Sequence, residues 1–361
     1  MSLSVTAYLI TTSKTVKQAM KQMSTIGEKE LFVVDTKEVL LGALSDGDIR
    51  KWIVREGNNL DKTIDGLYNT NPKFVGEDFD LEKVKELMVT FKIESVPVLD
   101  AQKKVVRVLI WDEVFGGKVE KHREQMNVPV VIMAGGKGSR LDPFTKVLPK
   151  PLIPIGDKPI IEMIMDQFTP YGIRNFYICV HHRSKMIKAY FEEFQGKYAI
   201  EYVEEKEPLG TVGSLKFLDG RLKDPFIVTN CDVIIHSDYA EMVKFHASHK
   251  NDLTLVVSCR HYVIPYGVCT TSDSGELKAI TEKPEYDLLV NTGMYVMNNS
   301  LLGLIPSGES FSILDLIEAA RRKGLRVGVF PIPEKAWVDV GQWEEYYKAV
   351  RQLNEMNPHE S

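Results

Sequence analysis

The sequence lacks the features that would place the protein in a membrane, outside the cell or on nucleic acid. No run of about 18 apolar residues is present, and no basic segment followed by an apolar run opens the chain, so we expect neither a membrane span nor a secretion signal. The 45 Lys and Arg residues face 50 Asp and Glu residues, which leaves no positive excess for nucleic acid. Four cysteines stand without paired spacing, which favours a reduced, cytoplasmic setting: Cys179, Cys231, Cys259 and Cys269.

The rest of the composition is typical of a globular protein with more than one domain. Of the 361 residues, 44% are hydrophobic and 26% are charged, which excludes collagen-like and disordered chains. At about 150 residues per domain, the length predicts two to three domains.

Two segments in the first third of the sequence repeat one another. Three pairs of positions keep a constant separation of 65 residues: Asp35 and Asp100, Ser45 and Ile110, and Asp48 and Glu113. Each copy is predicted to contain a short strand, a helix, a strand, a turn, a strand and a helix. Thr15, with Gln18 three residues later, and Asp80 in the second copy are expected to begin the first helix of each copy.

The repeated motif, an apolar strand followed by S/T-x-x-D, resembles a CBS-domain pair, a tandem module that in many proteins binds adenosine-type nucleotides. The resemblance covers residues 1–120, with repeats at 1–65 and 66–120. It implies that Ser45 and Asp48 hold the phosphate and ribose of an adenosine nucleotide, whereas Ile110 and Glu113 have lost the motif. Two alternatives stay open: Ser45 and Asp48 only cap the following helix, or the module serves assembly.

A polar linker is expected at residues 121–127, before a second domain at 128–361. Within this domain, strand-like runs alternate with amphipathic helical stretches; the runs lie at 128–134, 176–180, 200–203, 226–229 and 253–258, and the helices at 160–167 and 186–194. This alternation predicts an α/β fold with a mainly parallel sheet. Such sheets bind ligands at the carboxyl ends of their strands.

A glycine-rich turn follows the first of these strands directly. Gly135, Gly136 and Gly138 let backbone N–H groups approach an anion, and the guanidinium of Arg140 suits phosphate. The spacing fits neither the dinucleotide fingerprint nor the Walker A motif. Taken alone, the turn is also compatible with a plain connection between a strand and a helix.

The longer pattern, G-G-x-G-x-R-L followed by K-P-x-x-P and a further K-P, resembles the signature of sugar-1-phosphate nucleotidyltransferases. The resemblance extends over residues 128–361 and implies a Rossmann-like, GT-A-like domain with a mainly parallel or mixed sheet. It also implies roles for individual residues: nucleotide binding by Ala134, Gly135, Gly136 and Gly138, and catalytic phosphate contacts by Arg140 and Lys150.

Two later acids match the magnesium ligands of that family. Asp232 ends the run F-I-V-T-N-C-D, and Asp339 lies in the motif W-V-D-V-G. Mg²⁺ prefers hard carboxylate oxygens together with substrate phosphates. Spacing alone could not pair these residues, so their pairing and the Mg²⁺ cofactor are implied by the resemblance. Taken singly, each is compatible with a cap or turn residue.

The family's sugar-phosphate pocket is matched by two further motifs. In E-K-P, the resemblance implies that Glu282 holds sugar hydroxyls and that Lys283 neutralises the sugar phosphate. Asn291 begins an N-x-G-x-Y strand that lines the same pocket, and we assign Tyr266 and Gly267 to this set. The alternative for E-K-P is an exposed turn with an ion pair.

The base-recognition loop of the family is matched by Glu205, five residues before Gly210, with Thr211 next to it. An ionised carboxylate only accepts hydrogen bonds. Guanine offers two adjacent donors, whereas uracil and thymine offer one donor flanked by carbonyls, so we predict GTP as the substrate. Open alternatives are another base (UTP, dTTP or CTP) and a Glu205 that is a solvated acid at the rim.

The resemblance therefore implies that GTP and a hexose 1-phosphate react to give a nucleotide sugar and pyrophosphate. Mannose 1-phosphate is the default acceptor, and the fusion to a CBS pair resembles guanylyltransferases that act on glucosamine 1-phosphate. The alternative from another class is a catalytically silent sensor of nucleotide sugars, which the intact set of expected catalytic residues disfavours. We also expect a homo-oligomer, because CBS pairs commonly associate through their helices.

Overall fold

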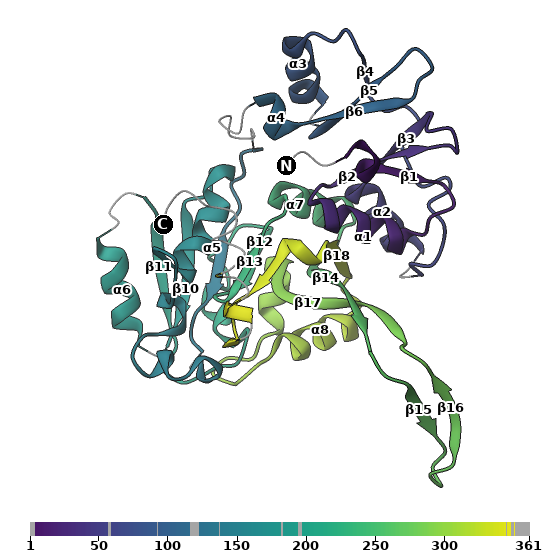
Figure 1. The fold of residues 1–361 in the computed structure, drawn as a ribbon. Helices are drawn as coiled ribbons and strands as arrows, with labels where there is room; N and C mark the ends of the chain where they lie inside the picture. Colours follow the sequence, from purple (N-terminus) through teal and green to yellow (C-terminus); the bar gives the residue numbers. More distant parts are fainter. Residues whose placement is uncertain are drawn as a thin grey trace. The chain divides into compact units, whose positions relative to one another are not determined.

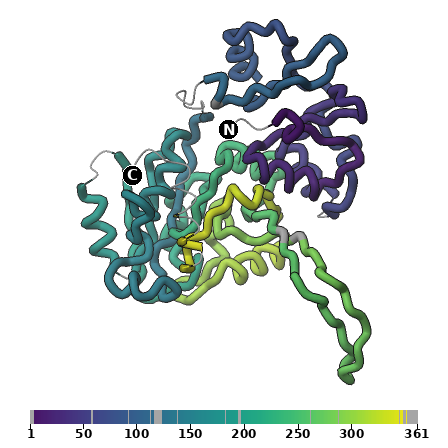
Figure 2. Tube along the Cα trace, in the orientation of Figure 1, coloured from purple at the N-terminus to yellow at the C-terminus, as the bar shows by residue number. Residues whose placement is uncertain are grey.

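The computed structural model of the protein describes residues 4–56, 59–91, 93–115, 123–136, 138–181, 183–193, 197–343, 345–347 and 350. The chain forms two compact units, which can be followed along the trace in Figure 2. The first unit contains Met1–Lys121, Arg260–Asp287 and Pro333–Lys335, and the second contains His122–Cys259, Leu288–Ile332 and Ala336–Ser361. No helix in the described ranges is long and apolar enough to cross a membrane.

The first 115 residues contain two copies of one arrangement of strands and helices. In each copy, a three-stranded sheet pairs its first two strands in parallel and its last two antiparallel. After a short 3₁₀ turn, η1 (Val5–Tyr8), the first copy contains β1 (Leu9–Thr11), α1 (Val16–Ile26), β2 (Glu30–Val34), β3 (Leu40–Ser45) and α2 (Asp46–Glu56). The second contains β4 (Val75–Gly76), α3 (Leu81–Phe91), β5 (Ser95–Leu99), β6 (Val105–Ile110) and α4 (Trp111–Phe115).

The first helix of each copy begins at the residue expected from the sequence. Thr15 and Gln18 form a capping box, because each side chain bonds the other residue's backbone N–H. In the second copy, Asp80 accepts a hydrogen bond from the backbone N–H of Glu82 at 2.9 Å. Side-chain acceptors of this kind satisfy the N–H groups that a helix leaves unpaired at its start.

The two copies contact each other through equivalent residues. Val39 pairs with Lys104, its equivalent 65 residues later. The Leu40 N–H donates to the Lys103 carbonyl, and the Val105 N–H donates to the Glu38 carbonyl. These two hydrogen bonds are equivalent, because Leu40 corresponds to Val105 and Glu38 corresponds to Lys103. The hydroxyl of Ser95 also donates to Glu30 Oε2 at 2.6 Å, again across 65 residues. Reciprocal contacts of this kind are typical of a two-fold axis between identical subunits. The duplicated segment is therefore an internal pseudo-dimer.

The second unit is built on a seven-stranded mixed sheet (Figure 1). Its strands, in spatial order, are β11 (Ala199–Glu204), β10 (Asn175–Val180), β7 (Val130–Met133), β12 (Phe226–Asn230), β17 (Glu285–Met297), β14 (Leu253–Val263) and β18 (Val327–Ile332). The first four strands run parallel, β17 runs antiparallel to β12, and β14 and β18 are parallel to each other. The expected α/β class with a mainly parallel sheet is confirmed.

Helices cover both faces of this sheet, as expected for parallel strands buried on both sides. On one face, Val131 and Val228 pack in an apolar cluster with Leu316 of α8 (Ile313–Arg322). On the other, the ring of Phe176 contacts Phe168, at the end of α5 (Ile160–Phe168), with centroids 6.2 Å apart. The remaining helices of this unit are α6 (Ser184–Glu192) and α7 (Tyr239–Ser248).

Short elements connect these larger ones. They are η2 (Ser139–Leu141), η3 (Phe144–Lys146), η4 (Lys150–Leu152), β8 (Pro154–Ile155), β9 (Lys158–Pro159), η5 (Thr169–Tyr171), η6 (Gly213–Leu218), β13 (Val233–Ile235), η7 (Asn299–Leu304), η8 (Glu334–Ala336) and β19 (Trp337–Asp339). The expected linker at 121–127 falls partly outside the described residues, and 123–129 contains no helix or strand.

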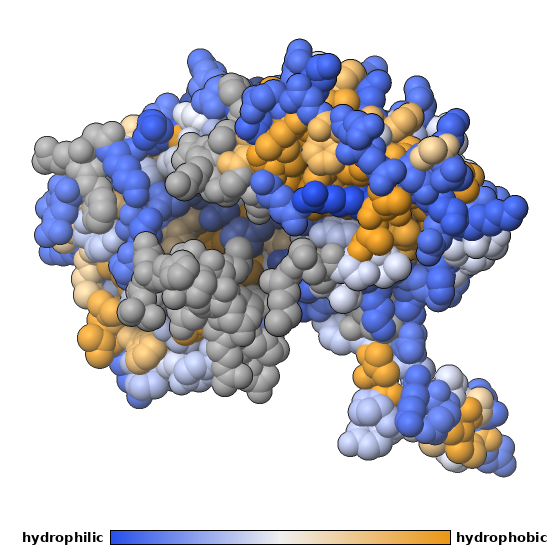
Figure 3. All heavy atoms as spheres, turned by 45° about the horizontal axis from the view of Figure 1, so that its top comes forward, coloured by the Kyte–Doolittle hydropathy of each residue, from blue (hydrophilic) through white to orange (hydrophobic). Residues whose placement is uncertain are grey.

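A two-stranded ribbon forms between β14 and β17 in the sequence. β15 (Val268–Thr271) pairs antiparallel with β16 (Leu277–Thr281), and every residue of β16 is exposed. Figure 3 shows the ribbon at its lower right, with hydrophilic and hydrophobic side chains both at the surface. The ribbon belongs to the compact unit that contains the duplicated segment.

Candidate active site

A cavity of about 270 Å³ opens in the second unit at the carboxyl end of β12, the edge at which α/β sheets bind ligands. Its lining combines charged, amide and hydroxyl groups with aromatic rings. The residues are Arg140, Thr211, Val212, Val228, Asn230, Asp232, Val233, Asn291, Thr292, Gly293, Tyr295, Ile313, Trp337 and Asp339.

Asp232 and Asp339, the two acids predicted to act together, lie side by side because two short strands pair. β13, which follows Asp232, runs antiparallel to β19, and Val233 is opposite Asp339 in this ladder. The backbone N–H of Val340 also donates to the Asp232 carbonyl at 2.9 Å. Burial raises the pKa of the Asp339 carboxyl; the hydrogen bond from the Gly341 N–H opposes this shift, and the charge of Asp232 reinforces it. The pairing thus concentrates negative charge in the cavity.

Lys150 supplies a positive charge at the same place. It begins η4, its side chain is only 8% exposed, and its ammonium forms an ion pair with Asp232 Oδ2. A buried charge requires a partner, because desolvation disfavours an isolated ion. The predicted phosphate-binding lysine is thus held against the first of the two predicted metal acids.

Gly341 marks the point at which these charged groups converge. A β-carbon added there would lie 2.6 Å from Asp232 Oδ2, 2.9 Å from Asp339 Oδ1 and 3.2 Å from Lys150 Nζ. Two carboxylate oxygens thus face a space that a methyl group would fill. Such hard oxygen donors fit a divalent cation that completes its shell with substrate phosphates and water. In the part of the chain that the structure describes, no third His, Cys, Asp or Glu joins them as a metal ligand.

The glycine loop after β7 contains two different kinds of glycine. Gly138 has a φ of +70°, and a β-carbon there would lie 2.9 Å from both Lys150 Cβ and Thr145 Cγ2. Gly136 is exposed, with no atom within 4 Å of a built β-carbon. Ala134 is buried and donates from its N–H to the Cys179 carbonyl at 2.8 Å. Gly138 is therefore required by packing, whereas Gly136 leaves open space.

Glu205 lies against this loop, so the alternative of a solvated acid at the rim is wrong. The residue is 8% exposed, and its Oε2 accepts a hydrogen bond from the Leu209 N–H at 3.2 Å. A β-carbon on Gly135 would lie 3.1 Å from Glu205 Oε1. The predicted base-recognition acid and the predicted nucleotide loop are therefore neighbours.

Gly210 and Thr211 place the end of the same segment against α8. Gly210 has a φ of +81°, and a β-carbon there would lie 2.7 Å from the Phe311 carbonyl oxygen. Thr211 lines the cavity, and its hydroxyl accepts a hydrogen bond from the Ile313 N–H at 2.9 Å.

The five predicted sugar-phosphate residues do not all line the cavity. Asn291 does, and its amide donates to the hydroxyl of Tyr295 at 2.9 Å. The others are exposed at one end of the β15–β16 ribbon, just before β15 and just after β16, in the other compact unit: Tyr266, Gly267, Glu282 and Lys283. Gly267 and Glu282 are neighbours there, because a β-carbon on Gly267 would lie 2.9 Å from Glu282 Oε2.

In the first unit, Ser45 and Asp48 form the helix cap that was the alternative to nucleotide binding. The Ser45 hydroxyl donates to Asp48 Oδ2 at 2.7 Å and accepts from the Asp48 N–H at 3.1 Å, while the Ser45 N–H donates to Asp48 Oδ2 at 3.0 Å. The Ser45 hydroxyl and the Asp48 carboxyl group thus both form hydrogen bonds at the start of α2. Nucleotide binding by this pair stays a prediction.

Sequence reasoning did not select three residues that shape the cavity, although each lay within a quoted motif. Gly341 follows Asp339 by two residues, Asn230 precedes Asp232 by two, and Tyr295 ends the N-x-G-x-Y pattern. A β-carbon on Gly293 would lie 2.5 Å from Asn230 Nδ2, so this asparagine packs against that motif. The available signal was proximity in sequence to residues already selected.

Comparison with known proteins agrees with this geometry. Mannose-1-phosphate guanylyltransferase 1 from Arabidopsis thaliana is 32% identical over 234 residues, covering 61% of this chain and 63% of its own length. A UTP–glucose-1-phosphate uridylyltransferase from Synechocystis sp. is 28% identical over 242 residues, covering 61% of this chain and 62% of its own length. The crystal structure of HddC from Yersinia pseudotuberculosis shares the fold, with a TM-score of 0.50 and 24% identity over 63% of this chain and 100% of that one.

This chain thus spans less than two thirds of the length of either curated relative. A CBS domain model matches residues 64–115, which cover most of the second repeat. The nucleotidyl transferase model matches residues 129–356, which is more than half of the chain and contains every residue of the cavity. The chain therefore belongs to the nucleotidyl transferase family and carries a CBS domain ahead of its nucleotidyl transferase domain.

Proposed function

We propose that the protein transfers a guanylyl group from GTP to a hexose 1-phosphate and releases pyrophosphate. The convergence of Asp232, Asp339 and Lys150 at Gly341 carries this proposal, in a cavity that Arg140 also lines. Fixed charges aimed at one point suit a reaction in which negative charge shifts between phosphate oxygens. Residues 128–361 would form the catalytic domain, preceded by a CBS pair at 1–120.

In the proposed reaction, a phosphate oxygen of the sugar 1-phosphate attacks the α-phosphorus of GTP. The new bond joins that oxygen to the α-phosphorus, and the bond from the α-phosphorus to the bridging oxygen breaks, so pyrophosphate leaves with the electron pair. The attacking oxygen is already anionic, so no residue has to remove a proton. Arg140 and Lys150 position the triphosphate of GTP and the phosphate of the sugar, and neutralise their charge.

Asp232 and Asp339 are the residues that would hold a divalent cation, for which Mg²⁺ fits the carboxylate donors. When bound, such an ion stabilises negative charge on phosphate oxygens as a Lewis acid. Lys150 has three N–H donors, so it can keep its bond to Asp232 while it donates to a phosphate. Gly341 leaves the space between the two carboxylates open.

The choice of guanine rests on Glu205. Its carboxylate is buried beside Gly135, where an acceptor-only group would favour a base edge with two adjacent donors. The relative from Arabidopsis carries the guanylyltransferase name, which supports GTP and mannose 1-phosphate. The uridylyltransferase relative keeps UTP and glucose 1-phosphate as the alternative pair.

Glucosamine 1-phosphate is a further candidate acceptor. We assign Asn291 and the ribbon residues Glu282 and Lys283 to the sugar phosphate.

Regulation belongs to the same proposal. An adenosine nucleotide would bind residues 1–120 at Ser45 and Asp48, in a cytoplasmic homo-oligomer. Because these side chains cap α2, binding would replace hydrogen bonds of the cap with hydrogen bonds to the nucleotide.

Product identification tests the proposed activity directly. The full chain is incubated with Mg²⁺, each of GTP, UTP, dTTP, CTP and ATP, and mannose, glucosamine or glucose 1-phosphate, and products are identified by mass spectrometry. We expect a GDP-hexose, with the largest yield from mannose 1-phosphate or glucosamine 1-phosphate. A nucleotide sugar of another base would overturn guanine selection, and no nucleotide sugar from any pair would overturn the activity.

Asp232→Asn separates catalysis from folding. We expect the initial rate to fall on the order of 10²–10³-fold, because a charge at the reacting centre is lost. The matched control is Asp219→Asn, an exposed acid paired with Lys216, which should keep the wild-type rate. Equal rates for the two variants, with equal urea midpoints, would contradict the role of Asp232.

A further inference from the structure

A second cavity, of about 180 Å³, lies at the opposite edge of the sheet from the candidate active site, at the amino ends of β7, β10 and β12. Three chain segments form its wall: the stretch that enters β7, the turn that enters β10 and the turn before β12. The residues are Met126, Asn127, Val128, Pro129, Gly172, Ile173, Arg174, Asn175, Tyr177, Arg221 and Lys223.

The charge of this wall has one sign. Arg174, Arg221 and Lys223 line the cavity, and none of the lining residues is acidic. Arg221 pairs with Glu201, and both of those side chains are 48% exposed. Lys223 is exposed and makes no ion pair within the described residues. One surface ion pair neutralises only part of the wall, so a net positive charge faces the cavity.

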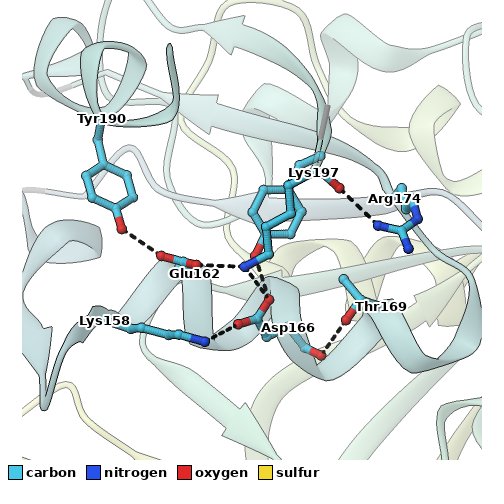
Figure 4. A network of polar contacts seen from close by, with 8 residues as sticks. Lys158, Glu162, Asp166, Thr169, Arg174, Tyr190 and Lys197 are labelled. Atoms are coloured by element: carbon cyan, nitrogen blue, oxygen red, sulfur yellow. Dashed lines mark hydrogen bonds and ion pairs between the residues drawn. The ribbon is translucent and has the colours of Figure 1, made fainter. Parts of the chain in front are cut away.

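Arg174 is held in place by a polar network that Figure 4 shows. Its guanidinium donates to the backbone carbonyl of Lys197 at 3.3 Å. The ammonium of Lys197 lies between two acids of α5, 2.8 Å from Glu162 Oε1 and 3.1 Å from Asp166 Oδ1. The carbonyl that orients Arg174 therefore belongs to a residue fixed by two ion pairs, and one of the two acids, Glu162, is buried.

Backbone hydrogen bonds also fix the segment at 126–129. The Met126 N–H donates to the Tyr171 carbonyl at 2.8 Å, and the Ile227 N–H donates to the Pro129 carbonyl at 2.9 Å. Both ends of this segment are thus tied to neighbouring segments of the second unit. A cavity whose walls are already bonded needs little ordering when a ligand enters, which favours binding.

We propose that this cavity binds the phosphate ester of a small organic molecule, such as a sugar phosphate. The guanidinium and ammonium groups supply charge-assisted donors for the phosphate, and the Asn127 and Asn175 amides add further polar groups. Met126, Val128, Ile173 and Tyr177 offer apolar surface to the organic part. The volume is below the about 300–1,000 Å³ of pockets for drug-sized ligands, so a compact ligand fits.

Hydrogen–deuterium exchange on the full chain tests this assignment locally, without an activity assay. The probes are glucose 6-phosphate, inorganic phosphate and glucose, and the readout is exchange at residues 123–129 and 171–177. The test variant is Arg174→Gln with Lys223→Gln. The matched control is Arg321→Gln with Lys323→Gln, which also removes one arginine and one lysine, both exposed and outside either cavity.

With glucose 6-phosphate, we expect slower exchange in both segments of the wild type and of the control variant. The test variant should need at least about tenfold more ligand, because two charge-assisted contacts are lost. Inorganic phosphate should bind more weakly than glucose 6-phosphate, and glucose should have no effect. The assignment would be overturned if glucose 6-phosphate protected the test variant as well as the wild type, or if glucose alone gave protection. It would also be overturned if inorganic phosphate bound as tightly as glucose 6-phosphate, or if neither of these two compounds gave protection.

Discussion

At the scale of single residues, the loop after β7 contains a glycine that packing requires. Gly138→Ala should lower the free energy of unfolding by about 1–3 kcal/mol, because the residue has a positive φ and its β-carbon would crowd Lys150 and Thr145. Since Lys150 would be displaced from Asp232, we also expect a lower initial rate. Urea midpoints and initial rates of wild type and variant measure both effects.

Gly136→Ala is the matched substitution two residues away. No atom lies within 4 Å of its built β-carbon, so the free energy of unfolding should change by less than about 0.5 kcal/mol. The proposed nucleotide contact at this backbone predicts a higher KM for GTP. An unchanged KM at unchanged stability would show that the nucleotide does not approach Gly136.

Glu205 provides a prediction about the base. Glu205→Gln keeps an oxygen that can accept the Leu209 N–H but replaces one acceptor with a donor. We expect kcat/KM for GTP to fall about 10–100-fold, because a bidentate contact to a base is worth about 1–3 kcal/mol. The ratio of UTP to GTP turnover should rise. A ratio equal to that of the wild type would contradict base selection by this residue.

At the scale of elements, β2 and β5 meet through an acid that is unfavourably placed. Burial raises the pKa of Glu30 to about 7; the hydrogen bond from Ser95 opposes this shift, and the negative charge of Asp48 adds to it. An unfolded glutamate ionises at a lower pH. Between the two values the folded chain keeps a proton that the unfolded chain has released, so stability falls as the pH rises through this range.

Glu30→Gln should remove this loss of stability at higher pH. The amide oxygen can still accept from Ser95, and no charge remains to be buried. At pH 8, we expect the variant to be more stable by about 1–2 kcal/mol, since one pKa unit corresponds to about 1.4 kcal/mol and partial exposure reduces the effect. The difference should shrink at pH 5. Urea midpoints of the full chain at both values measure it, and a constant difference would contradict the titration of Glu30.

Local patterns in the sequence predicted most elements, because apolar periodicity and helix caps depend on neighbouring residues. The helix after Thr15 and the strands β7, β10, β11 and β12 follow from such patterns. The pairing of β13 with β19 does not, since each contains only three residues and the partners are far apart in the sequence. This pairing brings Asp232 and Asp339 together. The ion pair between Lys150 and Asp232 was missed for the same reason.

At the scale of the whole molecule, separate apolar cores support separate units. Two clusters contain only residues from the first 115, and a third contains none before Val131. Removal of residues 1–121 should therefore leave a folded chain that still catalyses the proposed reaction, because every residue of the candidate active site remains. Any effect of adenosine nucleotides on its initial rate should disappear. A folded but inactive fragment would contradict the assignment of catalysis to the second unit.

The contact between Ser95 and Glu30 has a consequence for how the duplicated module could have diverged. Equivalent positions face each other there, so two identical copies would bring two glutamates or two serines together. A pair of carboxyl groups would repel when ionised, and a pair of hydroxyls would lose the hydrogen bond to the carboxyl oxygen. Within one chain, each copy can carry a different residue, which separate identical subunits cannot do. Covalent linkage thus permits broken symmetry at the pseudo-two-fold axis.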